Sequence, residues 1–146
     1  MPTLLPLNDI SHVIQLAIAP VFMLTAIGTV INVLAGRLGR SVDRRRVLVA
    51  ALPKLDSGMT NLVQAEIAFE IRRIHLIYIA ISMSVTSGLL VCLLIALAFI
   101  DAFVEMDFSK LIAGLFILAM VALIASLTIF LREIFLSIDS PRAPIV

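Results

Sequence analysis

The sequence predicts an all-α integral membrane protein, with three transmembrane helices and a cytoplasmic helical hairpin between the first and second. Hydrophobic residues make up 62% of the 146 residues and charged residues only 14%, whereas soluble domains are about 25% charged. A soluble chain this small could not bury so much apolar surface, because small domains leave a large fraction of their surface exposed. Lipid is therefore expected to cover the remainder.

Three windows without Asp, Glu, Lys or Arg define the expected spans, at about residues 10–36, 74–100 and 111–131. About 20 apolar residues cross the hydrocarbon core of a bilayer, so each window is long enough. Because the backbone in lipid must satisfy its own hydrogen bonds, each window is predicted to be a helix. No internal repeat is visible, and residues 1–146 are predicted to form a single membrane domain. No basic residue precedes the first window, which favours a permanent span over a cleaved signal peptide.

The distribution of basic residues predicts the orientation. Eight of the eleven lie between the first two windows: Arg37, Arg40, Arg44, Arg45, Arg46, Lys54, Arg72 and Arg73. The short connection 101–110 carries one basic residue and three acidic ones. The positive-inside rule places residues 37–73 in the cytoplasm. The N-terminus is then expected outside and the C-terminus in the cytoplasm.

The cytoplasmic segment 37–73 is predicted to be a helical hairpin. No proline occurs between Gly36 and Pro53, so the first helix is expected to continue beyond its apolar window. Pro53 and residues 56–58 supply turn chemistry. After the turn, apolar residues recur at spacings of about three and four, which predicts a helix that leads into the second window: Leu62, Val63, Ile67, Ile71 and Ile74.

The first span carries a stripe of polar side chains. At 100° per residue, its polar members fall within an arc of about 100° and share a heptad spacing with Ile18 and Phe22; they are Ser11, Gln15, Thr25, Thr29 and Asn32. One interpretation is helix packing, within one chain or around a symmetry axis, because polar and small residues in membrane helices usually face other helices.

The second interpretation of this stripe is a channel-like pore lined by the first helix. In a homo-oligomer with this helix innermost, Ile18 and Phe22 would form a constriction that gates by dewetting. Polar rings would replace part of an ion's hydration shell, at Gln15, Thr25, Thr29 and Asn32. Acidic residues on the predicted outer side would concentrate cations there: Asp9, Asp101, Glu105 and Asp107. A cation-favouring pore is the leading functional hypothesis.

The alternative is a non-conducting membrane scaffold or assembly protein that uses the basic hairpin as its contact surface. The arginines concerned are Arg37, Arg40, Arg44, Arg45 and Arg46. Clusters of this kind next to a span contact anionic lipid headgroups and anchor the topology. The other interpretation of the cluster is a docking surface for a cytoplasmic ligand or protein partner.

Other function classes find no support in the motifs. The chain has no phosphate-binding loop and no dinucleotide fingerprint. His12 and His75 are predicted at opposite ends of their spans, so one chain does not bring them to one metal ion. The hydroxyl residues Ser82, Ser84, Thr86 and Ser87 lie on the second span with no base in a matching pattern. We expect no enzymatic activity, no cofactor, no metal site and no nucleic-acid partner.

Three stretches resemble a family of small bacterial membrane proteins known as domain of unknown function 2721. They are HVIQLAIAPVFMLTAIGTVINVLAGRLGRSVDRRR, EIRRIHLI at the start of the second span, and FLREIFL after the third. The resemblance extends from about Ile10 to about Ile138. It implies a bacterial protein of the inner membrane, and it supplies no catalytic or binding residues.

Overall fold

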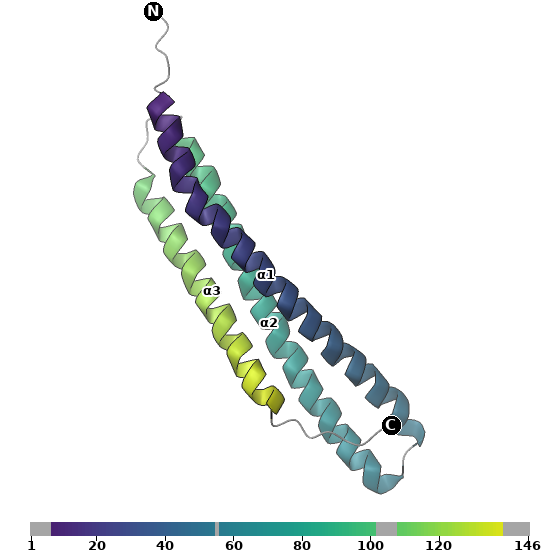
Figure 1. Ribbon diagram of the computed structural model, residues 1–146. Coiled ribbons are helices and arrows are strands. Elements are labelled where there is room, and N and C mark those ends of the chain that lie inside the picture. Colours follow the sequence, from purple (N-terminus) through teal and green to yellow (C-terminus); the bar gives the residue numbers. More distant parts are fainter. Residues whose placement is uncertain (1–6, 55, 102–107, 139–146) are drawn as a thin grey trace, which may run out of the picture. The chain divides into compact units, whose positions relative to one another are not determined.

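The computed structural model describes residues 7–54, 56–101 and 108–138, without the side chains of residues 7–13, 16, 17 and 57. It contains α1 (Leu7–Ala51), the short 3-10 helix η1 (Leu52–Lys54), α2 (Ser57–Asp101) and α3 (Ser109–Ile138) (Figure 1). Each of the three α-helices is long and apolar enough to cross a membrane. The all-α prediction and the three predicted helices are therefore confirmed.

Both long helices extend beyond their charge-free windows. α1 passes through Pro20 without interruption and ends at Ala51, directly before the Pro53 turn. The backbone N–H and the side-chain hydroxyl of Thr60 both bond the carbonyl of Asp56, which fixes the first turn of α2. The predicted helical extension past Gly36 and the predicted turn at Pro53 are confirmed. The cytoplasmic location of this segment stays a prediction.

The described chain divides into two compact units, each with a segment of all three helices. The first comprises Met1–Val30 and Met83–Ile124, and the second Ile31–Ser82 and Ala125–Val146. In the first unit, the Ser87 hydroxyl of α2 donates to the Ala119 carbonyl of α3 at 2.8 Å, and both residues are fully buried. Asp101 Oδ1 accepts the Phe108 N–H at 2.9 Å, which links the end of α2 to the start of α3.

The second unit repeats the serine contact and adds an antiparallel helix pair. The Ser126 hydroxyl of α3 donates to the Ala80 carbonyl of α2 at 2.7 Å. Further along, Leu48 of α1 and Val63 of α2 are fully buried against each other, with Leu52 and Ile67 packed around them. The segments of α1 and α2 on either side of the Pro53 turn therefore form a packed helical hairpin.

The buried positions recur at heptad spacing. On α1 they fall seven residues apart, at Pro20, Ile27, Leu34, Ser41 and Leu48. On α3 the same interval separates Ala119, Ser126 and Glu133. On α2 the interval alternates between three and four, as in Ala80, Ser84, Ser87, Val91 and Leu94. A narrow stripe of this kind is typical of helices that pack along a coiled-coil seam.

The small buried residues of this seam predict that the two faces of α3 differ in their tolerance of large side chains. Replacing Ala119 by Leu puts three additional carbons where the residue is fully buried and its carbonyl accepts the Ser87 hydroxyl. Overpacking of this kind costs about 1–3 kcal/mol. We expect Ala119→Leu to lower the midpoint of thermal unfolding in detergent micelles.

The matched control is Ala113→Leu, the same substitution at an exposed position of the same helix. It should leave the midpoint unchanged. Equal midpoints for the two variants would contradict the packing of α3 against α2.

Candidate functional site

A buried carboxylate joins all three helices in the second unit. Glu133 of α3 has no exposed side-chain surface. Its Oε2 accepts hydrogen bonds from Nε and Nη2 of Arg37 on α1, both at 2.8 Å. Its Oε1 accepts from Nε and Nη2 of Arg73 on α2, at 3.1 and 2.9 Å. Each carboxylate oxygen is thus held by two N–H groups of one guanidinium, in charge-assisted hydrogen bonds.

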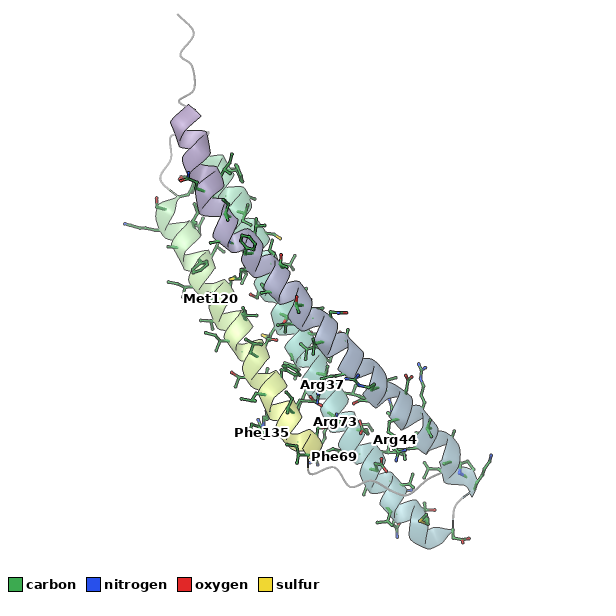
Figure 2. The ribbon with its side chains drawn as sticks, viewed as in Figure 1. Arg37, Arg44, Phe69, Arg73, Met120 and Phe135 are labelled. Atoms are coloured by element: carbon green, nitrogen blue, oxygen red, sulfur yellow. The ribbon has the colours of Figure 1, made fainter. Side chains whose placement is uncertain are left out.

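A second carboxylate completes this ion-pair cluster. Glu70 lies one turn before Arg73 on α2, and its Oε1 accepts from Arg73 Nη1 at 3.0 Å. The side chain of Glu70 is only 5% exposed and that of Arg73 14%. The four charges of Arg37, Glu70, Arg73 and Glu133 sum to zero, as burial in a region of low dielectric demands. We call these four residues the buried ion-pair cluster; its two arginines, Arg37 and Arg73, are labelled in Figure 2.

Two features complete the surroundings of the cluster. The Arg37 guanidinium lies over the ring of Phe130, 5.6 Å from its centroid, within the range of a cation–π contact. Oε2 of Glu70 is buried and has no hydrogen-bond partner among the described residues. An unsatisfied buried acceptor costs about 1–3 kcal/mol. Of the two carboxylates in the cluster, Glu70 is therefore the one held less strongly.

A separate ion pair supports the hairpin. The Arg44 guanidinium of α1 donates from Nε and Nη2 to Oε1 of Glu66 on α2, at 2.9 and 2.8 Å. The Glu66 side chain is buried, at 2% exposed, whereas that of Arg44 is 34% exposed. Arg46 and Asp43, in contrast, approach only to 3.9 Å with more than three quarters of each side chain exposed.

The predicted arginine surface therefore divides into two groups. Arg37 and Arg44 point inward to buried carboxylates. Arg40, Arg45 and Arg46 are exposed and remain open to lipid or to a partner. Within the hairpin segment, Glu66 pairs with Arg44 and Glu70 with Arg73. Sequence reasoning missed Glu133, whose role depends on α3.

One pattern in the sequence could have located Glu133. The three charge-free windows end next to Arg37, Arg73 and the Arg132–Glu133 pair. Helices that cross a membrane in alternating directions bring the end of the first window, the start of the second and the end of the third to the same side. Opposite charges at one level are expected to meet, because an unpaired buried charge is costly.

The polar stripe of α1 is exposed wherever its side chains are described. In the first unit, Ile18 is 49% exposed and Phe22 72% exposed, and Gln15, Thr25 and Thr29 are exposed as well. Asn32, in the second unit, is also exposed. The Thr29 hydroxyl donates to the Thr25 carbonyl one turn earlier at 3.0 Å. The amides of Gln15 and Asn32 have no hydrogen-bond partner in the described part of the chain. In the described part of the chain, this face of α1 is therefore left largely exposed.

The predicted acidic mouth is only partly covered by the structure. Asp101 is half-buried and accepts the Phe108 N–H through Oδ1. Glu105 and Asp107 lie outside the described residues, and so does the side chain of Asp9. Within the described ranges, no three side chains of His, Cys, Asp or Glu gather where they could hold a metal ion.

Three apolar helices of spanning length, tied together by a buried ion-pair cluster, define the class of small, multi-pass helical membrane proteins. Within this class the chain belongs to the family described as Protein of unknown function (DUF2721), whose family model matches residues 17–143. The resemblance found in the sequence is thereby confirmed. Comparison with curated proteins found no match, and comparison with solved structures found none either.

Removing the Glu133 charge is expected to destabilise the fold strongly. Glu133→Gln leaves Arg37 and Arg73 with one carboxylate, Glu70, between them. Loss of one partner from a buried ion pair typically costs about 3–5 kcal/mol. We expect a loss of this size in the free energy of unfolding, measured by denaturant titration in micelles.

A double-mutant cycle provides the control for this prediction. Arg37→Gln combined with Glu133→Gln should cost less than the sum of the two single substitutions, because the second change removes the uncompensated charge. Asp43→Asn, at the exposed pair with Arg46, should change stability by less than about 0.5 kcal/mol. If Glu133→Gln cost no more than Asp43→Asn, the cluster would have no role in stability.

Proposed function

We propose that this protein is a homo-oligomer of the bacterial inner membrane in which the α1 stripe lines a cation-favouring, channel-like path. In this arrangement residues 37–73 lie in the cytoplasm and the N-terminus lies outside. The observation that carries the proposal is the exposure of the stripe on the single chain. All six predicted lining residues with described side chains are exposed: Gln15, Ile18, Phe22, Thr25, Thr29 and Asn32.

Lipid is a poor environment for this face. The amide groups of Gln15 and Asn32 would face hydrocarbon without partners, and polar groups transferred there without hydrogen bonds cost several kcal/mol. Association of several copies through this face removes that cost, because amides in membrane helices bond across to neighbouring helices or to water in a cavity. The opposite face of α1, with Ile27 and Leu34, is already buried within the chain.

The order of side chains along the stripe supports a gated path more than a simple packing surface. Phe22 is the more exposed of the two large apolar side chains assigned to the stripe, at 72% against 49% for Ile18. A close-packed helix interface favours small residues, which let the backbones approach. A large aromatic ring between polar levels fits a hydrophobic constriction that controls the entry of water. Phe22 with Ile18 is therefore assigned to the constriction, and Thr25 and Thr29 to the polar level beside it.

The channel proposal predicts ion flux and a gain of flux at Phe22. Purified protein in liposomes should pass monovalent cations, followed with an ion-sensitive dye inside the vesicles. Phe22→Ala removes the ring from the proposed constriction and should increase the flux several-fold. Absence of flux in both proteins would exclude the channel.

Cross-linking tests the central position of α1 independently of conduction. In a Cys92→Ser background, Phe22→Cys should form disulfide-linked dimers in membranes. Ile117→Cys, 63% exposed on α3 of the same unit, is the matched control and should remain monomeric. Cross-linking through Ile117 alone would place α1 at the periphery and end the channel proposal.

The scaffold remains the second candidate function because part of the hairpin surface is exposed and is available to a partner. Arg45 is exposed without an ion pair among the described residues, and Val47 and Leu62 are 55% and 57% exposed beyond the charge-free windows. Exposed apolar side chains beside positive charge fit a protein partner with an acidic, partly apolar surface.

Charge reversal tests the scaffold without disturbing the hairpin. Arg45→Glu with Arg46→Glu leaves the Arg44–Glu66 pair in place and should remove a co-purifying partner while the unfolding temperature stays within a few degrees. Retention of every co-purifying protein by this variant would count against the scaffold. Liposome flux is measured on the same variant, so the two functions are separated.

A further inference from the structure

Three arginines beside the buried ion-pair cluster have no partner within the described residues. They are Arg40 on α1, Arg72 on α2 and Arg132 on α3, one on each helix, and all three are exposed. Their neighbours Arg37 and Arg73 are committed to Glu133. The second unit thus carries paired arginines inside and unpaired arginines outside. We call the unpaired three the arginine girdle.

The ion pairs bring the girdle to one level of the second unit. Arg72 adjoins Arg73 in the chain and Arg132 adjoins Glu133, while Arg40 follows Arg37 by three residues. At 1.5 Å per residue of helix, Arg40 lies about 4.5 Å beyond Arg37 along the axis. Because Glu133 contacts both Arg37 and Arg73, the backbone positions of the three exposed arginines lie within about one helical turn of the same level.

This level coincides with the ends of all three apolar windows. On the apolar side of it, large side chains lie exposed on each helix: Val33 on α1 is 46% exposed, Tyr78 on α2 64% and Leu131 on α3 53%. In a membrane this is where hydrocarbon gives way to headgroups. Arginine side chains place their apolar stems along the hydrocarbon and their charge among the headgroups. The guanidinium fork matches a phosphate group with two parallel hydrogen bonds.

We propose that Arg40, Arg72 and Arg132 bind the phosphate groups of anionic phospholipids in the leaflet on the hairpin side. The girdle would hold the three helices at a defined depth, and the buried cluster would hold the girdle residues at a common level. This inference rests on the membrane insertion within the proposed function and is independent of conduction. Of the five arginines suggested by the sequence it keeps only Arg40, because Arg37 and Arg44 are internally paired. Arg45 and Arg46 lie about 12–14 Å beyond Arg37 along α1.

The test compares lipid binding by two triple variants of the full chain. Protein in neutral detergent micelles is titrated with phosphatidylglycerol and, separately, with phosphatidylcholine, and bound lipids are counted by native mass spectrometry. The wild type should prefer phosphatidylglycerol. An arginine near an anionic surface contributes about fivefold in affinity. We therefore expect Arg40→Gln, Arg72→Gln and Arg132→Gln together to weaken phosphatidylglycerol binding at least about tenfold.

The control removes the same charge elsewhere on the second unit, through Arg45→Gln, Arg46→Gln and Lys54→Gln. The measurement is made at about 0.15 M ionic strength, where charges are screened beyond about 8 Å. The control should bind like the wild type. Equal losses in both triple variants, or no loss in the girdle variant, would overturn the proposal.

Two further measurements keep the outcome decisive. Glycerol phosphate, which carries the headgroup charge without acyl chains, should not displace the bound lipid; if it does, the ligand is a free phosphate compound and the lipid assignment is wrong. Should the triple girdle variant fail to fold, Arg132→Gln alone is compared with Arg132→Lys, which keeps the charge and should keep most of the binding. Failure of the chain to float with vesicles would instead contradict membrane insertion itself.

Discussion

A carboxylate that is withdrawn from solvent has to be neutralised where it lies, and Glu133 meets this requirement with one arginine from each of the other two helices. The arrangement ties α1, α2 and α3 at one level of the second unit. It also sets their register, because sliding any helix by one turn would move a charge away from its partner by about 5.4 Å. A buried charge left in this way costs more than the intact pair contributes.

The seams between α2 and α3 have a different character. Small side chains lie at these seams, and serine hydroxyls donate from one helix to a backbone carbonyl of the other. Ser87 and Ala119 make such a contact in the first unit, and Ser126 and Ala80 in the second. These contacts need close approach of the backbones, which only small residues permit. The cluster determines which levels of the helices meet, and the seams determine how closely they pack.

The two faces of α1 are used differently as a consequence. The face with Ile27, Leu34 and Leu48 is consumed by packing within the chain. The face with Phe22, Thr25 and Asn32 is left exposed, although it carries most of the polar side chains of the span. In the proposed homo-oligomer, further copies of the chain would cover the polar groups on this face and enclose the ion path. The exposed arginines at the end of the apolar windows form a third surface, which we propose binds lipid headgroups.

Much of the fold was predictable from local properties of the sequence. The three helices follow from the charge-free windows, the extension of α1 from the absence of proline before Pro53, and the family from motifs quoted directly from the chain. The polar stripe was also visible, because positions on one helix follow from its period. The sequence did not show whether the stripe packs against another helix of the same chain or stays exposed. Nor did it show the partnership of Glu133 with Arg37 and Arg73, residues separated by 96 and 60 positions. A helix is specified by its own residues, whereas contacts between helices depend on which faces pack together, and only the tertiary structure decides that.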